Sequence, residues 1–405
     1  MPEPTADSLG RRDFLAATAG VAIPWVRPAQ VSSTAAQSAI RLGLIGCGGR
    51  GRWIAPLFMK HGGYRLVACA DYFPDRAEAV GQQWHIGASQ RYSGLSGYKR
   101  LLEAPVDAVV IESPPGFHPE QAGAAVEAGK HVFLAKLIAV DVPGCQTIAQ
   151  CGKKATETKR VMLVDFQTRA DPRFREAVAR VHRGDLGRLV CGEAHYPWSG
   201  GGPGAPIHSP EERLRLWYFS LDLCGDVIVE QDIHALDVAT WIVGADPIRA
   251  SGLCGRAIRK YGQISDHFIV TYWFPNDFVL SFTSVKCIPG VRDEIRCRIF
   301  GTEGVIDTDY FGDVAIRGNK PYQGGPSDPS IASGLYLTGT VNNIAEFHRA
   351  ITAGDFTNPT VAPSVRSNLT CILGRTAAYE KRMVTWEEML RANQRIELDL
   401  RGLKS

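Results

Sequence analysis

The sequence predicts an α/β protein in two parts: a doubly wound domain on a parallel sheet, then an α+β domain with a large, open, mostly antiparallel sheet. From residue 40 to residue 166, short apolar runs alternate with helix-like stretches, which is typical of a parallel sheet with helices on both faces. After residue 245 the pattern changes to long β-type runs. The length of 405 residues favours two domains, which we place at residues 39–165 and 166–405.

The composition is that of a globular protein, with 45% hydrophobic and 21% charged residues and a formal net charge of +3. Because Lys and Arg form no dense run, we expect neither nucleic acid nor an anionic membrane surface as a partner. No apolar run reaches the roughly 18 residues that a membrane-spanning helix needs, so stable membrane insertion is not expected. The ten cysteines form no CxxC pair and no Cys/His cluster, which argues against a metal site.

The first 38 residues resemble a twin-arginine export signal. Arg11-Arg12-Asp13-Phe14-Leu15 is followed by the short apolar run AATAGVAIPWV and then by small residues through Ala36. The alternative is a basic N-terminus without a targeting role. The resemblance implies a periplasmic or other extracytoplasmic location, and export of a protein that has already folded, often around a bound cofactor. We therefore place residues 1–38 outside the folded domains.

A glycine-rich loop connects the first predicted strand, residues 40–45, to the helix-like stretch RWIAPLFMK. The loop fits the GxGxxG pattern in the strand–loop–helix context that dinucleotide binding requires. Its first glycine allows a tight turn, the second lets the backbone approach a pyrophosphate, and the third lets the helix pack on the strand. A glycine turn in some other α/β protein is the alternative. The candidate cofactor-binding residues here are Gly46, Cys47, Gly48, Gly49, Arg50 and Gly51.

A second strand, RLVACAD, ends in Asp71, twenty residues beyond Gly51. A carboxylate at this position can accept hydrogen bonds from the adenosine ribose hydroxyls, and it repels a 2′-phosphate. Together with the glycine loop, Asp71 predicts a Rossmann domain that binds NAD in preference to NADP.

Further strands and helices follow in alternation. Strands are expected at residues 107–112, 131–136 and 161–166, and helices at residues 117–129 and 142–158. Ligands of such folds bind outside the carboxyl ends of the strands. The residues at these ends are further candidates for the nucleotide crevice: Asp71, Ser113, Pro114, Lys136 and Gln167.

Four stretches of the chain resemble the Gfo/Idh/MocA family of glucose–fructose oxidoreductase and inositol dehydrogenase: GLIGCGGRG, ESPPGFHPEQAGAAVEAGKHVFLAK, VEQDIHALDVATW and AAYEKRMVTWEEM. The resemblance covers residues 40 to about 395. It implies NAD(P)-dependent chemistry on a carbohydrate, with His118 of the PPxxH turn in the cofactor site. It also implies that Lys136 lies beside the nicotinamide and the substrate hydroxyl. The family's usual Glu-Lys-Pro triplet is here Ala135-Lys136-Leu137.

The stretch EQDIHALD predicts a largely buried helix with Glu230, His234 and Asp237 on one face. Buried ionisable groups are costly unless they are paired or functional. The resemblance matches Glu230 and His234 to the family's acid and histidine. We interpret His234 as the base that takes the hydroxyl proton and Lys136 as the group that stabilises the developing alkoxide. Glu230 would orient the sugar or the lysine. The alternative is a core histidine bonded to Asp237.

Other polar residues are weaker candidates for contacts with the substrate. Arg169 could clamp a sugar hydroxyl or pair with Asp171. His195 and Tyr196 precede a glycine-rich loop, residues 199–204, that could act as a lid. Aromatic rings of this kind can stack on a pyranose or simply pack at the surface. The full set of these candidates is Gln167, Arg169, His195, Tyr196, Asp232 and Lys286.

The second half predicts strands at residues 247–256, 266–274, 278–287 and 294–301, with a tight hairpin at Pro275-Asn276-Asp277. The run HFIVTYWF is apolar on nearly both faces, whereas a strand of a one-sided sheet should alternate. A second subunit is the simplest cover for the extra apolar face, so we expect a homo-oligomer, a dimer or tetramer. A loop at residues 319–336 and helices at residues 340–354 and 362–382 complete the chain.

Three functions remain open from the sequence. The first is an oxidoreductase that transfers hydride between a sugar and a nicotinamide cofactor held tightly by the protein. The second is a glycosidase that oxidises a sugar transiently, eliminates the aglycone and re-reduces the product with the same NAD. The third is a degenerate protein that binds sugar or NAD without catalysis, which the altered triplet around Lys136 makes conceivable.

Overall fold

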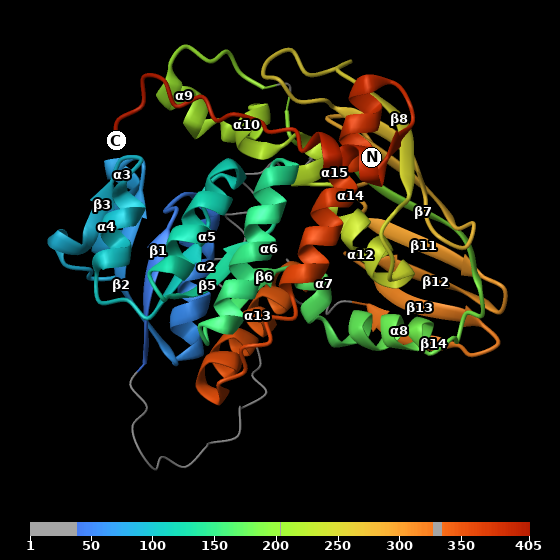
Figure 1. The fold of residues 1–405 in the computed structure, drawn as a ribbon, viewed down its shortest axis with the longest axis horizontal. Coiled ribbons are helices and arrows are strands. Elements are labelled where there is room, and N and C mark those ends of the chain that lie inside the picture. Colours follow the sequence, from blue (N-terminus) through green and yellow to red (C-terminus); the bar gives the residue numbers. More distant parts are fainter. Residues whose placement is uncertain (1–38, 203, 327–333) are drawn as a thin grey trace, which may run out of the picture.

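The computed structural model describes residues 39–202, 204–326 and 334–405 as two sheets with helices between and around them (Figure 1). The predicted export signal, residues 1–38, lies outside the described residues. Within the described ranges, no helix is long and apolar enough to cross a membrane.

In the described part of the chain, the first sheet is parallel and has six strands in the order β3-β2-β1-β4-β5-β6. Strands β4 and β6 are buried throughout, as expected for strands with helices on both faces. The strand order reverses between β1 and β4, and this is where such sheets bind ligands. The predicted alternation is confirmed. The strands are β1 (Ile40–Ile45), β2 (Tyr64–Asp71), β3 (Arg91–Ser93), β4 (Ala108–Ile111), β5 (His131–Ala135) and β6 (Met162–Asp165). The helices are α2 (Gly49–His61), α3 (Pro74–Gln83), α4 (Gly97–Glu103), α5 (His118–Glu127) and α6 (Val142–Glu157).

The second sheet has nine strands among the described residues, in the order β14-β13-β12-β11-β7-β10-β9-β8-β15. Its paired strands run antiparallel except β7 with β10, which confirms the predicted open, mostly antiparallel sheet. The strands β7, β12, β13, β14 and β15 were not predicted from the sequence. The strands are β7 (Leu189–Trp198), β8 (Arg249–Gly255), β9 (His267–Trp273), β10 (Val279–Lys286), β11 (Arg296–Gly301), β12 (Gly304–Asp309), β13 (Asp313–Gly318), β14 (Tyr322–Pro326) and β15 (Val384–Thr385).

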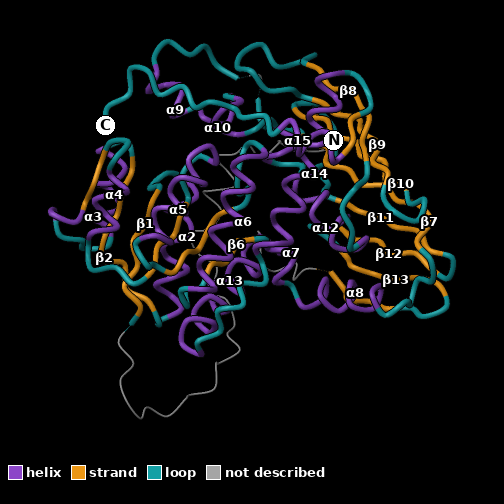
Figure 2. Tube along the Cα trace, in the orientation of Figure 1, coloured by secondary structure: helices purple, strands orange, loops and turns teal. Residues whose placement is uncertain are grey.

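Helices lie between the two sheets (Figures 1 and 2). α12 (Ile233–Val243) and α14 (Val361–Glu380) pack on the second sheet, and α14 also contacts α6. α13 (Gly334–Ala353) packs on α2, on β6 and on α7 (Gln167–Ala170). Helix α13 begins earlier than predicted, and β14 replaces part of the loop expected at residues 319–336. The other helices are α8 (Pro172–His182), α9 (Pro210–Arg215), α10 (Leu221–Cys224), α11 (Val227–Glu230) and α15 (Trp386–Ala392).

The face of the second sheet that points away from these helices is partly apolar. Along β9, Phe268, Val270 and Tyr272 are buried, whereas Ile269 on the opposite face is 61% exposed. Leu253 of β8 is paired with Ile269 in the register and is 59% exposed. The run HFIVTYWF therefore presents apolar side chains to solvent in the single chain.

The helix predicted across residues 230–237 is interrupted, so that prediction is wrong in part. α11 ends at Glu230, and α12 begins three residues later. Asp232 lies in the interruption, where its carboxylate is 2.7 Å from the ammonium group of Lys286 on β10. This tertiary ion pair holds the start of α12 in place, which a local helical pattern cannot anticipate.

Candidate active site

The glycine loop contains glycines that the fold requires and glycines that leave space for a ligand. A Cβ on Gly51 would lie 1.9 Å from the carbonyl oxygen of Gly46, so a side chain there would push α2 away from β1. Gly46 itself has a φ of 96°, which favours glycine. By contrast, a Cβ on Gly49 would meet nothing within 4 Å, and one on Gly48 would have a single contact, at 3.5 Å. Open space beside a helix N-terminus is what a pyrophosphate needs.

Asp71 lies beside this loop at the end of β2. Its carboxylate accepts hydrogen bonds from the backbone N–H groups of Cys47 and Phe73, over 2.8 and 2.9 Å. Burial raises the pKa of Asp71, while these two bonds act in the opposite direction. Each carboxylate oxygen keeps a second lone pair for a ribose hydroxyl. Because its N–H donates to the Asp71 carboxylate, Cys47 positions Asp71, and this N–H is not available for the predicted contact with the cofactor.

An open pocket lies against Asp71. In this fold the adenosine half of a dinucleotide binds at such a position, on the β1–β2 side of the crevice. The predicted residues in its lining are Gly46, Asp71, Ser113 and Pro114, and further residues of the lining include Arg76, Phe117 and, from α9, Leu214.

His118 has a structural role that corrects the prediction. Its Nδ1 lies 2.7 Å from the carbonyl oxygen of Leu137, and its Nε2 lies 2.9 Å from that of Ser113. The side chain is enclosed, and burial lowers its pKa to about 4. Both ring nitrogens lie within hydrogen-bond distance of a backbone carbonyl, and the neutral ring donates to one of them, so His118 connects the turn after β4 to the segment after Lys136. This enclosed position corrects the prediction that the His118 side chain faces the cofactor.

Lys136 follows directly after β5, at the carboxyl edge of the first sheet. Its ammonium group donates to the backbone carbonyl of Glu230 over 2.6 Å and lies 3.5 Å from the Glu230 carboxylate. Each of these two side chains is 16% exposed, so the pair is accessible to a small substrate. The peptide bond between Lys136 and Leu137 is cis. The structure thus brings together the two residues that the sequence analysis had linked.

His234 lies in the first turn of α12, with its ring centroid 5.4 Å from that of Tyr310. The imidazole is largely buried, and its Nδ1 has no hydrogen-bond partner among the described residues. Burial lowers the pKa of His234 well below its ordinary value, and the charges of Lys136, Arg50 and Lys286 lower it further. His234 is therefore neutral at neutral pH and can accept a proton.

A fully buried ion pair between Asp232 and Lys286 lies near His234. Lys286 is 2.7 Å from Asp232, donates to the backbone carbonyl of Tyr196 over 2.7 Å, and lies 3.5 Å from the centroid of the Tyr196 ring. Burial raises the pKa of Asp232 to about 6, although Lys286 acts against this shift. Both charged side chains are 0% exposed. Asp232 and Lys286 therefore position α12 and His234, and neither contacts the substrate directly as predicted.

Arg50 points away from the glycine loop into a buried ionic cluster. Its guanidinium pairs with Asp165 at the end of β6 and lies 3.4 Å from the carboxylate of Glu112, just after β4. The rings of Trp53 and Tyr336 enclose it, with centroids 4.6 and 4.8 Å away. Because two carboxylates share this guanidinium, the side chain of Arg50 is held within the protein, which corrects the prediction of a cofactor contact for this side chain.

Two further substrate candidates are held within the protein. The side-chain amide of Gln167 donates to the Asp165 carboxylate over 3.0 Å, and Gln167 is 2% exposed. Arg169 makes hydrogen bonds of 2.8 to 3.0 Å to both oxygens of Asp237, and not to Asp171 as predicted. The same contacts show that the Asp237 carboxylate binds Arg169. The alternative that His234 is a core histidine bonded to Asp237 is therefore wrong.

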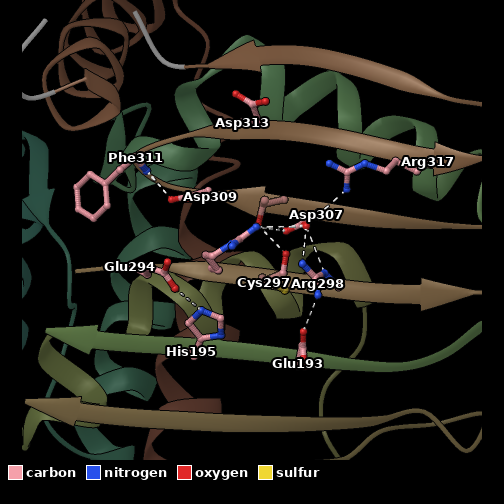
Figure 3. A network of polar contacts seen from close by, with 12 residues as sticks. Glu193, His195, Glu294, Cys297, Arg298, Asp307, Asp309, Phe311, Asp313 and Arg317 are labelled. Atoms are coloured by element: carbon pink, nitrogen blue, oxygen red, sulfur yellow. Dashed lines mark hydrogen bonds and ion pairs between the residues drawn. The ribbon is translucent and has the colours of Figure 1, made fainter. Parts of the chain in front are cut away.

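His195 lies on the outer face of the second sheet, opposite to the face that carries Lys286. Successive side chains of a strand point to opposite faces, and Tyr196 is the one that meets Lys286. Nε2 of His195 lies 3.2 Å from Glu294, next to a polar network in which Arg298 pairs with Asp307 (Figure 3). His195 is therefore corrected to a residue of the outer sheet face.

Four residues of the site were not predicted from the sequence: Glu112, Asp165, Tyr310 and Tyr336. Glu112 and Asp165 stand at the carboxyl ends of β4 and β6, so the rule that identified Lys136 could have found both. Tyr310 follows β12 and Tyr336 belongs to α13, and no local pattern relates either tyrosine to the first sheet.

The site fits a dinucleotide. The open glycine loop suits a pyrophosphate, Asp71 suits a ribose, and Lys136 marks the opposite end of the crevice. Among the described residues, no group of three or more His, Cys, Asp or Glu side chains could hold a metal ion. A neutral imidazole and an accessible ammonium group together can move one proton and stabilise one negative oxygen.

Comparison with known proteins agrees with this geometry. Residues 40–165 match the oxidoreductase family with an NAD-binding Rossmann fold, and residues 174–307 match the Gfo/Idh/MocA C-terminal domain. The chain is 35% identical over 270 residues to inositol 2-dehydrogenase 3 of Saccharopolyspora erythraea, covering 66% of this chain and 72% of that protein. It is 25% identical over 362 residues to an inositol 2-dehydrogenase of Rhizobium meliloti, covering 85% of this chain and 99% of that protein.

The solved structure of a levoglucosan dehydrogenase in complex with NADH and levoglucosan shares the fold. Its TM-score is 0.71 at 20% identity, and the match covers 86% of this chain and 99% of that chain. The family matches to both domains, together with these relatives, show that the chain is an NAD(P)-dependent oxidoreductase and belongs to the Gfo/Idh/MocA family.

Proposed function

We propose that the protein transfers hydride between NAD and a secondary hydroxyl group of a polyhydroxylated ring, a sugar or an inositol. Two features carry this proposal: Lys136 is held by Glu230 at the carboxyl edge of the first sheet, and His234 is buried and neutral within the electrostatic reach of Lys136. The relatives named as inositol dehydrogenases, and the fold shared with a levoglucosan dehydrogenase, support the substrate class.

When bound, the cofactor supplies the hydride acceptor. The ammonium group of Lys136, held by the Glu230 carbonyl, donates to the substrate oxygen and stabilises its developing negative charge. His234 is neutral and takes the hydroxyl proton. The carboxylate of Glu230 keeps Lys136 in place and offers an acceptor to a neighbouring hydroxyl group.

The test is a panel of inositols, sugars and glycosides, with cofactor reduction and product formation measured for each. We expect at least one inositol or sugar to be oxidised with one reduced cofactor formed per product. Cleavage of a glycoside without net cofactor reduction would instead identify the redox-neutral glycosidase. Absence of turnover on every compound would contradict the substrate class.

We also propose that the cofactor is held tightly. The segment of residues 394–405, in red at the top of Figure 1, crosses from α15 to the first domain. The backbone carbonyl of Lys404 accepts a hydrogen bond from the backbone N–H of Leu95. The backbone N–H of Lys404 donates to the hydroxyl group of Tyr72. Leu398 and Leu403 of the segment pack in one cluster with residues from the pocket wall. This segment, together with α9, supports slow release of the dinucleotide because it covers the loop after Asp71.

Tight retention fits the proposed export, because a protein that leaves the cytoplasm needs to bring its cofactor along. We expect the purified protein to carry close to one nicotinamide dinucleotide per chain after dialysis. Extraction with acid followed by chromatography measures this content. Protein that is empty and works only with added NAD at high concentration would contradict both tight retention and export with bound cofactor.

A further inference from the structure

Thr168 of the short helix α7 is held next to α12, the helix that carries His234. The residue after it, Arg169, makes hydrogen bonds of 2.8 to 3.0 Å to both oxygens of Asp237. Asp237 follows His234 by three residues on α12, so the two side chains lie on the same face of that helix. The contact between Arg169 and Asp237 therefore places Thr168 on the side of α12 where His234 stands.

Thr168 and His234 also line one small cavity, together with Tyr310. The ring of Tyr310 packs on the imidazole of His234, with the two centroids 5.4 Å apart. The hydroxyl group of Tyr310 donates to the side-chain oxygen of Gln167, the residue before Thr168, over 3.4 Å. Both chain neighbours of Thr168 thus bind residues that surround His234.

Two buried polar atoms of this lining have no hydrogen-bond partner among the described residues: the hydroxyl oxygen of Thr168 and Nδ1 of His234. No other described side chain of the lining contributes such an atom. Thr168 is 1% exposed, so solvent does not reach its hydroxyl group. Buried polar groups without partners destabilise a fold. Each of these two groups is what the other lacks, because an imidazole N–H donates and a hydroxyl oxygen accepts.

The two ring nitrogens of His234 differ in their surroundings. Nδ1 is enclosed, whereas Nε2 makes no hydrogen bond with the described residues and belongs to the part of the side chain that is 8% exposed. A neutral imidazole carries one N–H and one nitrogen with a free lone pair. A proton on Nδ1 leaves the lone pair on Nε2, where a substrate can reach it. A proton on Nε2 would turn the lone pair toward the enclosed cavity.

The charged groups around this imidazole do not include a free acid that could hold the Nδ1 proton. Asp237, the acid on the same helix face, is bound by Arg169. The charges that act on the His234 imidazole are cations, and the cavity lining adds one more: Lys136, Arg50, Lys286 and, in the lining, Arg296. The neutral hydroxyl group of Thr168 is therefore the acceptor that the described lining offers to Nδ1.

We propose that Thr168 is a positioning residue whose hydroxyl oxygen accepts the Nδ1 proton of His234 and thereby leaves Nε2 free to take the proton of the substrate hydroxyl group. The hydrogen bond closes by a small rotation of the two side chains across the cavity that they share. The proton from the substrate ends on Nε2, and Nδ1 keeps its own proton. This inference rests on the proposed role of His234 as the base.

The first experiment compares kcat for three threonine variants on the most active compound of the substrate panel. Thr168→Val keeps the shape and removes the hydroxyl group, so kcat should fall about tenfold, the scale of one hydrogen bond, with KM and NAD affinity near wild type. Thr168→Ser keeps the hydroxyl group and should restore most of kcat. Thr308→Val is the matched control and should keep the wild-type kcat, because Thr308 lines the same cavity but donates to the Cys297 carbonyl over 3.0 Å.

A second comparison separates positioning from a merely structural role. In the His234→Ala background, Thr168→Val should lower kcat no further, because the hydrogen bond that it removes is already absent. A structural role of Thr168 would instead lower kcat by the same factor in both backgrounds. Equal kcat in Thr168→Val and the wild type, or equal factors in the two backgrounds, would overturn the proposal.

The tautomer can be measured without any substrate, by ¹⁵N NMR of the full-length protein labelled at the histidine ring nitrogens. The signals of His234 are those that disappear in His234→Ala. In the wild type Nδ1 should carry the proton, and Thr168→Val should shift the proton toward Nε2. A wild-type His234 that is protonated on Nε2 would overturn the inference even where a variant does not fold. Absence of turnover on the whole panel, with the proton on Nδ1, would contradict the proposed function and leave the contact with Thr168 supported.

Discussion

Lys136 and His234 differ in their contacts within the protein, and substitution of either residue is expected to lower turnover. Lys136 has two contacts with Glu230 and is partly exposed, whereas His234 is buried with an unpartnered Nδ1. Lys136→Ala and His234→Ala should each lower kcat by roughly 10² or more, the usual scale for a proton-transfer group. The affinity of His234→Ala for NAD(H), measured by fluorescence titration, should stay near wild type. Near-normal turnover in both variants would show that the assignment is wrong.

The lowered pKa of His234 predicts how kcat depends on pH. A base whose pKa lies below 6.5 stays deprotonated, and therefore active, at every pH above that value. With saturating substrates, kcat should not fall through protonation of His234 between pH 8 and pH 6.5. An acid limb centred within this window that disappears in His234→Gln would contradict the buried, neutral imidazole.

Asp71 predicts the choice of cofactor. Its carboxylate faces the adenosine pocket while accepting two backbone hydrogen bonds, which hold it in place. A 2′-phosphate there would meet a like charge at short range. We expect NAD(H) to bind at least about tenfold more tightly than NADP(H), and Asp71→Asn to narrow the difference. Fluorescence titration of both cofactors measures this, and tighter binding of NADP(H) by the wild type would overturn it.

At the scale of elements, the segment of residues 394–405 and α9 predict slow cofactor release. Arg215 of α9 lies 3.8 Å above the ring of Phe73 and pairs with Asp75, while Leu398 packs on the same cluster. Burial of one leucine side chain contributes about 1.5 to 3 kcal/mol, and 1.4 kcal/mol corresponds to a factor of ten. Leu398 is only partly buried in this cluster, so Leu398→Asp should raise the release rate of NADH several-fold, measured by stopped-flow fluorescence.

The control for this prediction is Met383→Ala, which changes an apolar side chain of similar size that is 42% exposed. Its release rate should match the wild type. Equal release rates in Leu398→Asp and the wild type would show that the segment does not retain the cofactor, whatever the nucleotide content of the purified protein.

At the scale of the whole molecule, the outer face of the second sheet predicts self-association. Ile269 and Leu253 lie side by side and exposed on β9 and β8, and the network around Arg298 and Asp307 continues the same face (Figure 3). A contiguous surface that combines apolar and charged groups suits a two-fold interface. We propose a dimer or tetramer formed through this face. Light scattering after gel filtration should give a multiple of the chain mass at micromolar concentration.

Ile269→Glu combined with Leu253→Glu should shift the protein to the monomer, because it places two like charges opposite each other at the centre of the contact. Val341→Glu is the matched control, since Val341 is 44% exposed on α13, and it should leave the mass unchanged. A wild-type protein that is already a monodisperse monomer would rule out this interface.

Much of the first domain followed from the sequence because its signals are local. A buried strand, a glycine loop, a helix and a second strand ending in Asp71 occupy one continuous stretch of the chain. The same reasoning placed Lys136 at the ligand edge, since every parallel strand presents its carboxyl end there. Strand β7 escaped prediction because its inner and outer residues differ little in polarity, and its central place in the second sheet depends on partners far along the chain.

The sequence by itself determined the fold class and the dinucleotide loop, and it predicted the residues Lys136, Glu230 and His234, because each rests on a local pattern or a family motif. Only the tertiary structure decided which charges meet. Arg50 pairs with an aspartate 115 residues away, and Lys136 reaches a glutamate 94 residues away. A buried charge is stable only beside a partner, so the partner is whichever opposite charge the packed elements bring into reach. Sequence spacing does not encode that choice, and packing of the sheets and helices makes it.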